Sequence, residues 1–167
     1  MSEKPSTPRR IADGHVAQVA ALDPVTSTRL GLTPEDDRLP DLSPQGFEAL
    51  AELARQSLSS LDTAERDGEK NGVVWEDAER TCARLLRERL TSELALHEAG
   101  DHIRALRNVG SPLHRVRRIF TLMPTGTDEN WAAVAGRLRN LPGALGPEEQ
   151  QHDRHNGRPA GSSGRTG

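Results

Sequence analysis

Apolar side chains recur every three or four residues over most of the chain, which is the spacing of one buried face of an α-helix. No stretch alternates apolar and polar residues as a half-buried β-strand does. The pattern predicts helices at residues 11–22, 24–30, 44–66, 75–99, 112–123 and 128–141, with a polar connection at residues 67–72. We therefore expect an all-α fold, built as an antiparallel helical bundle or a set of helical hairpins.

Polar–proline pairs mark where three of these helices begin. Asp23-Pro24, Ser43-Pro44 and Ser111-Pro112 each place a capping oxygen before a proline, whose missing N–H costs nothing at the first helical position. Gly31 and Gly100 follow two predicted helix ends, where glycine favours the left-handed backbone that stops a helix. Residues 33–41 are acidic, contain two prolines and predict an exposed loop.

The periodicity also predicts which side chains are buried. The stripe of the long 75–99 helix comprises Trp75, Ala78, Cys82, Leu86, Leu90 and Leu94. The stripe of the 112–123 helix comprises Leu113, Val116, Phe120 and Met123, and that of the last helix comprises Trp131, Val134, Leu138 and Leu141. Arg137 and Arg139 suit the C-terminal end of the last helix, where the helix dipole favours positive charge.

Composition limits how much of the chain a core can order. Leu, Ile, Val and Phe make up about one residue in five, the level at which disorder becomes common. Beyond Leu145 the sequence is rich in Gly, Ser, Arg and His and has almost nothing apolar to bury. We predict a disordered N-terminus at residues 1–8, a helical region at 9–145 and a disordered tail at 146–167.

The charge balance and the N-terminal sequence narrow the partners and the compartment. The chain has 22 basic and 25 acidic residues and a net charge of −3, which does not favour nucleic acid or an anionic membrane as a partner. No early apolar stretch is long enough for a signal peptide or a transmembrane helix. We expect a cytoplasmic protein.

His97, Glu98 and His102 are the residues that come nearest to a metal-binding motif. Common zinc peptidases place two histidines at i and i+4 on one helical face, with a glutamate that activates water. Here the spacing is i and i+5, roughly 140° around a helix, and Gly100 interrupts the helix between them. We therefore interpret these residues as a polar helix end, and we assign no metal, cofactor or catalytic residue to this chain.

Five arginines form a local basic cluster: Arg104, Arg107, Arg115, Arg117 and Arg118. One interpretation is a surface that contacts phosphate, an acidic protein or RNA. The other is a solvated outer face of two helices whose charges pair with the acidic remainder of the chain. No aromatic residues interleave with the cluster, as stacking on single-stranded nucleic acid requires. The sequence leaves both interpretations open.

Several short stretches together resemble the N-terminal region of the domain-of-unknown-function family 885. Their order and spacing are specific as a set, and the resemblance extends from about Ile11 to Leu145. The stretches are Ala20–Val25, Leu30–Leu32, Asp36–Gly46, Leu96–Gly100 and Ser111–Pro124. The style of the sequence is similar to that of actinobacterial proteins.

The resemblance implies a place in a larger protein. Members of the family are longer, largely helical and grouped with zinc metallopeptidases. Their metal-binding segment resembles His-Glu-x-x-Pro-Gly-His, which this sequence lacks, and the matched region would be the helical wall or lid beside a substrate channel. Zinc would belong to the full-length proteins.

We therefore interpret the chain as a truncated, non-catalytic N-terminal fragment of a metallopeptidase-like protein. Its partner would be the missing C-terminal catalytic portion, or a second copy bound through exposed apolar helix faces. The alternative is a small helical interaction module that uses its Arg-rich face.

Overall fold

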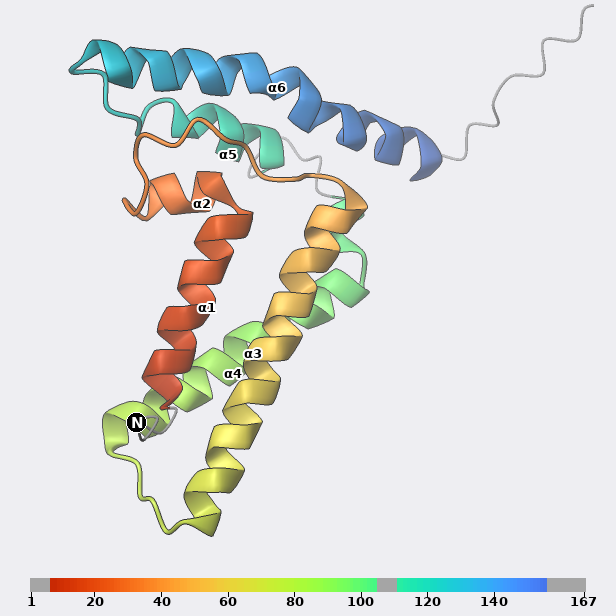
Figure 1. The fold of residues 1–167 in the computed structure, drawn as a ribbon. Helices are drawn as coiled ribbons and strands as arrows, with labels where there is room; N and C mark the ends of the chain where they lie inside the picture. Colours follow the sequence, from red (N-terminus) through yellow and green to blue (C-terminus); the bar gives the residue numbers. More distant parts are fainter. Residues whose placement is uncertain (1–6, 105–110, 156–167) are drawn as a thin grey trace, which may run out of the picture.

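The computed structural model describes residues 7–104 and 111–155, and every regular element in these ranges is helical (Figure 1). The elements are α1 (Pro8–Leu22), α2 (Pro24–Arg29), α3 (Pro44–Lys70), α4 (Asp77–Glu98), the 3₁₀ turn η1 (Asp101–Arg104), α5 (Pro112–Ile119) and α6 (Asp128–His155). The described ranges contain no strand, and the order of the helices agrees with the apolar pattern. The prediction of an all-α fold is confirmed.

Four helices begin at a proline that follows a capping side chain. Each capping oxygen accepts a hydrogen bond from a backbone N–H in the first turn; the caps are Thr7, Asp23, Ser43 and Ser111. The three predicted starts are confirmed. The Thr7-Pro8 start was not expected, and Pro8 is buried, so the helical region begins before the boundary that we placed at residue 9.

Glycines in the left-handed region follow three helices. Gly31, Gly72 and Gly100 have φ angles of 73°, 65° and 70°, which residues with a Cβ rarely adopt. Gly31 and Gly100 lie where helix ends were predicted. α3 continues to Lys70, so the first part of the predicted polar connection at residues 67–72 is helical, and Gly72 follows the end of the helix.

The three long helices α1, α3 and α4 pack against one another and form the larger body of the molecule (Figure 1). α3 and α4 form a hairpin and run in opposite directions. Leu61 of α3 and Leu90 of α4 are almost completely buried. Ala83, rather than Ala78, is the buried alanine of α4, because Ala78 lies in the first turn and faces solvent.

The shorter helices α2 and α5 lie above this body, and α6 runs across the top of the molecule (Figure 1). The buried face of α6 differs from the predicted one. Trp131 and Leu138 are 57% and 50% exposed, whereas Arg137 is 0% exposed. Leu113 of α5 is also exposed, and Val116, Ile119 and Met123 are buried in that part of the chain.

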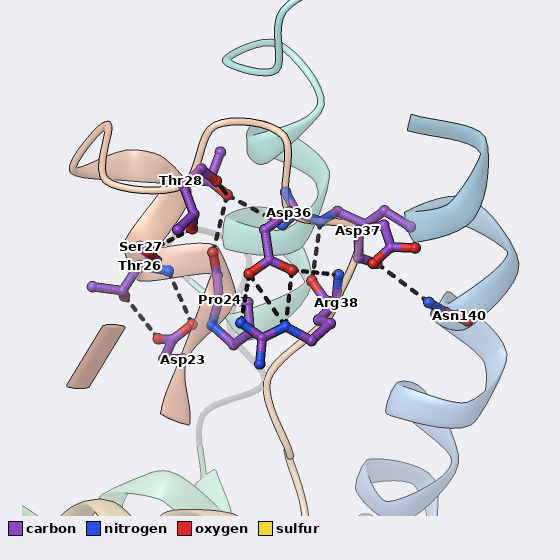
Figure 2. A network of polar contacts seen from close by, with 11 residues as sticks. Asp23, Pro24, Thr26, Ser27, Thr28, Asp36, Asp37, Arg38 and Asn140 are labelled. Atoms are coloured by element: carbon purple, nitrogen blue, oxygen red, sulfur yellow. Dashed lines mark hydrogen bonds and ion pairs between the residues drawn. The ribbon is translucent and has the colours of Figure 1, made fainter. Parts of the chain in front are cut away.

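The buried face of α6 is rotated by about one residue from the predicted one, since Val134 and Leu141 stay partly buried, and it contacts the acidic loop at residues 33–41. Arg137 Nε donates to the carbonyl oxygen of Arg38 at 3.0 Å, and Arg137 Nη2 donates to Thr28 Oγ1 at 3.1 Å. Asn140 Nδ2 donates to the carbonyl oxygen of Asp37 at 3.2 Å (Figure 2). A loop with exposed carbonyl groups is stabilised by polar donors, and leucine supplies none.

Burial and the neighbouring carboxylates have opposite effects on the pKa of Arg137. Burial lowers the pKa of Arg137, and the nearby carboxylates of Asp36 and Asp37 raise it. Asp36 also forms a salt bridge of 2.7 Å with Arg38, and this contact helps to lower the pKa of Asp36 (Figure 2). The loop is therefore exposed, as predicted, but its backbone is fixed between α2 and α6.

The helix α6 extends beyond the boundary at which we expected the tail to begin. It continues to His155, past residue 146, where the predicted tail begins. The rest of the predicted tail, and residues 1–6 of the predicted N-terminal tail, lie outside the described residues.

Candidate functional site

A cleft of about 690 Å³ opens between α1, α3 and α4. Its apolar surface comes from all three helices and includes Val16, Val19, Leu50, Ala54, Leu90 and Leu94. Residues of η1 and α5 line the cleft as well, among them His102 and Arg115. The volume of the cleft lies in the range of small-ligand sites, and polar or charged side chains make up a large share of its lining.

Small side chains on α3 and a polar cross-link to α1 shape the cleft. Ala51 and Ala54 line it, and their short side chains leave space that larger residues would fill. His15 Nδ1 of α1 and Ser57 Oγ of α3 share a hydrogen bond of 2.9 Å. Burial lowers the pKa of His15, and the charge of Glu93 raises it by a smaller amount. His15 is therefore held mainly as the neutral imidazole at neutral pH.

The acidic groups that line the cleft are already engaged within the chain. Asp23 caps α2 and accepts hydrogen bonds from Thr26 N at 3.0 Å and Thr26 Oγ1 at 2.7 Å. Glu93 accepts a hydrogen bond of 2.6 Å from Arg89 Nε. Asp101 is also engaged in an interaction.

Three arginines line the cleft, and Arg89 is the one that pairs with a carboxylate among the described residues. Within the described part of the chain, neither Arg29 nor Arg115 forms a salt bridge. Arg29 lies at the end of α2 and Arg115 lies on α5, and these two helices pack against each other. The cleft thus has two cations on neighbouring elements, and neither has a carboxylate within salt-bridge distance in this part of the chain.

His97 and His102 lie together in the cleft, although the sequence predicted that they would diverge. Their rings are stacked, with centroids 4.6 Å apart and planes 10° apart. The left-handed Gly100 redirects the chain after α4, so η1 brings His102 back onto His97. His102 also contacts Phe47, with ring centroids 5.0 Å apart. The sequence indicated that Gly100 ends the helix, but helical spacing could not show where the chain turns after it.

The stacked pair does not fit a zinc ion. The lone pair of an imidazole nitrogen lies in the plane of its ring, so two nearly parallel stacked rings do not direct their nitrogens at one point. In addition, His97 Nε2 is 2.9 Å from Glu48 Oε2. Glu98 is exposed. Among the described residues, no group of three or more histidine, cysteine or acidic side chains is arranged to hold a metal ion.

One atom of the histidine pair has no partner. His102 Nδ1 is buried and makes no hydrogen bond within the described residues. Burial lowers the pKa of His102, and the neighbouring His97 lowers it further. An unsatisfied buried polar atom costs about 1–3 kcal/mol, which a bound ligand or water molecule recovers by supplying the missing hydrogen bond.

Known protein families provide a second line of evidence besides the geometry of the cleft. The sequence profile of a family described as "Bacterial protein of unknown function (DUF885)" matches residues 24–160, which is most of the chain. The chain belongs to the DUF885 family. No curated protein matches the chain. The match includes all of α2 to α6 and therefore most of the cleft, and the resemblance found in the sequence is confirmed at the level of the family.

The structure of this DUF885 chain separates the arginine cluster that the sequence grouped together. Arg107 lies outside the described residues, and Arg104, Arg115, Arg117 and Arg118 are all exposed. On α5, Arg115 and Arg118 are one turn apart, whereas Arg117 lies on the opposite side, roughly 160° from Arg115. Of these residues only Arg115 is known to line the cleft. Binding of an acidic partner by the whole cluster stays a prediction.

Two further features of the DUF885 chain bear on its chemistry. Burial raises the pKa of the free thiol Cys82, so the reactive thiolate is disfavoured at neutral pH. In the described part of the chain, no helix combines the length and the apolar character needed to cross a lipid bilayer.

Proposed function

We propose that this DUF885 chain is the non-catalytic helical region of a larger, zinc-peptidase-like protein, and that its cleft is part of the wall along which a peptide lies. In this proposal the catalytic residues and the zinc ion belong to another part of the protein. The chain contributes binding surface and excludes water from the apolar side chains of the peptide.

The observation that carries the proposal is the cleft between α1, α3 and α4. Its apolar residues suit the side chains of a peptide, and its polar residues suit a peptide backbone. Thr26 and the histidines His97 and His102 are among these polar residues. Because the backbone of a peptide has a donor and an acceptor at almost every residue, a binding surface of mixed character accepts it more readily than a purely apolar one does.

The experiment measures binding and hydrolysis separately with the purified chain. Isothermal titration calorimetry with acetyl-Leu-Ala-Leu, as the free acid and as the C-terminal amide, should show saturable binding of at least one form. Val16→Trp should abolish that binding, because Val16 is 44% exposed and lines the cleft, so that the indole fills it. Leu85→Trp is the matched control, since Leu85 is exposed on α4 and is not a cleft residue.

The second measurement tests the non-catalytic part of the proposal. After dialysis, elemental analysis should find no stoichiometric zinc, and chromatography should find both peptides intact after long incubation. Retained zinc together with peptide hydrolysis that disappears in His97→Ala would overturn the proposal in favour of an enzyme. If neither peptide binds, the cleft is not a peptide surface and the proposal is wrong.

A further inference from the structure

We propose that the cleft recognises the carboxyl terminus of an apolar peptide, with Arg29 and Arg115 binding the terminal carboxylate and His102 donating a hydrogen bond to it. This inference rests on the proposed function, because it specifies which part of a peptide the cleft receives.

The first support is the charge balance of the cleft. Its three acidic groups are engaged within the chain: Asp23 caps α2, Glu93 pairs with Arg89, and Asp101 has an interaction of its own. Arg29 and Arg115 form no salt bridge in the described part of the chain. A ligand carboxylate would supply the ion-pair partner that these two side chains lack.

The second support is the position of the two arginines. They come from α2 and α5, which are far apart in sequence but packed together above the body formed by α1, α3 and α4 (Figure 1). The apolar residues of the cleft come mostly from α1, α3 and α4. A ligand with its charge at one end and its apolar groups along its length matches this arrangement. A peptide whose last residues are apolar has that form.

The third support is the unpartnered nitrogen of His102. His102 lines the cleft, and its Nδ1 is buried without a hydrogen bond among the described residues. In the tautomer that carries a proton on Nδ1, this nitrogen donates to a carboxylate oxygen. Hydrogen bonds from a neutral donor to a charged acceptor are stronger than those between neutral groups, so this contact favours an anionic ligand.

A peptide terminus fits the cleft better than a fatty acid, which has the same carboxylate. A fatty acid would cover polar groups such as Thr26, Glu93 and His97 with methylene groups and would leave them without water. A peptide backbone supplies a donor and an acceptor for such groups at each residue. We therefore take the peptide as the occupant, and the fatty acid serves as the competing case in the test.

The test compares acetyl-Leu-Ala-Leu with its C-terminal amide by isothermal titration calorimetry on the full chain. The acid should bind about 10–100 times more tightly than the amide, the range expected for charge-assisted hydrogen bonds of about 1.5–3 kcal/mol. Raising the salt concentration should reduce this preference, because the arginines are at least partly exposed to solvent. Decanoate should bind more weakly than the peptide acid.

The variants separate the arginines of the cleft from other positive charges. Arg29→Gln combined with Arg115→Gln should remove most of the preference for the acid, and the small preference that remains is the contribution expected of His102. Arg117→Gln is the matched control, because it removes the same charge from α5 at an exposed position on the opposite side from Arg115. Circular dichroism melting of each variant establishes that it is folded before binding is compared.

Each contrary result points to a different claim. Equal binding of the acid and the amide by the wild-type chain would overturn carboxylate recognition and leave the proposed peptide surface standing. An undiminished preference for the acid in the double variant would show that other residues hold the carboxylate and would overturn the assignment to Arg29 and Arg115. Tighter binding of decanoate than of the peptide would overturn the choice of a peptide. Failure of both peptides to bind would overturn the proposed function itself.

Discussion

The two halves of this molecule are held together by different chemistry. In the body, α1, α3 and α4 bury residues such as Leu61 and Leu90 against one another. In the upper layer, α6 holds the loop at residues 33–41 through Arg137, Asn130 and Asn140, with Trp131 and Leu138 facing outward. The difference shows how a chain poor in large apolar residues extends its fold beyond the core that it can fill, because polar side chains fix a loop where no apolar partner exists.

The largest expected effect is in the body. Leu61→Ala should lower the free energy of unfolding by about 4 kcal/mol, since Leu61 is completely buried and its truncation leaves a cavity. Chemical denaturation followed by circular dichroism measures this change. Leu122→Ala serves as a control, because Leu122 is exposed and should change stability little. A loss as small as that of the control would show that the body is loosely packed.

Removal of the buried charge tests the upper layer. Arg137→Ala should lower the free energy of unfolding by about 3 kcal/mol, because it removes charged hydrogen bonds to Arg38 and Thr28. Amide hydrogen exchange should accelerate in the loop at residues 33–41 and remain unchanged in α3. Arg137→Lys should not restore slow exchange, since an ammonium group cannot reproduce the geometry of the guanidinium. Uniform acceleration in both regions would mean that the two halves unfold together.

The next largest effect on stability is expected at Gly46, whose backbone lies close to that of Asp41. A Cβ on Gly46 would overlap the carbonyl oxygen of Asp41, so the loop must shift to accept Gly46→Ala. We expect a loss of about 2 kcal/mol, typical of overpacking. Gly14→Ala is the control within α1, where a Cβ meets nothing within 4 Å. If the Gly46 variant proved as stable as the control, the approach of the loop to α3 would be wrong.

Two glycines of α6 allow a smaller and sharper comparison. A Cβ on Gly136 would lie 2.8 Å from Asp37 Oδ2, so Gly136→Ala should cost about 1 kcal/mol by displacing that flexible side chain. At Gly143 a Cβ meets nothing within 4 Å, and alanine is the better helix former, so Gly143→Ala should stabilise by up to about 1 kcal/mol. Thermal melting of both variants measures the difference. Effects of the same sign would contradict the contact between α6 and the loop.

The pH dependence of stability gives the smallest effect and concerns the body. The pKa values of His15 and His102 are lowered in the folded state, so the unfolded state takes up protons first as the pH falls below about 6.5. The free energy of unfolding should therefore be highest above that pH and decrease as the pH falls through the lowered values. His102→Phe should make this decrease shallower, and an unchanged slope would contradict the burial of His102. The carboxylates of Asp36 and Glu48, whose pKa values are also lowered, contribute losses only at lower pH, near and below about 4.

Local signals in the sequence predicted local features of the fold. The caps Ser43 and Ser111 could be found because each acts on a backbone N–H within its own first turn. The buried face of α6 could not be found in this way. If polar side chains can be buried, helical periodicity leaves two possible buried faces for α6. The choice between them depends on the loop at residues 33–41, where Arg38 lies 99 residues from Arg137 in sequence.

The candidate site was predicted only in part. His97 and His102 were identified from the sequence, but their stacking depends on the backbone of Gly100, which no helical spacing rule describes. Arg115 was identified within a cluster of similar charges, whereas Arg29 and His15 were not considered, because nothing near them in sequence forms a motif. The cleft brings these residues together from α1, α2 and α5, and such a site is visible only in three dimensions.

The long separation between Arg38 and Arg137 has a consequence for synthesis on the ribosome. At about 5–20 residues per second, the acidic loop leaves the ribosome about 5–20 s before the guanidinium that will hold its carbonyl groups. The hairpin of α3 and α4 is already made during that interval. The nascent chain therefore assembles its apolar body first, and the loop at residues 33–41 stays hydrated until α6 has been synthesised.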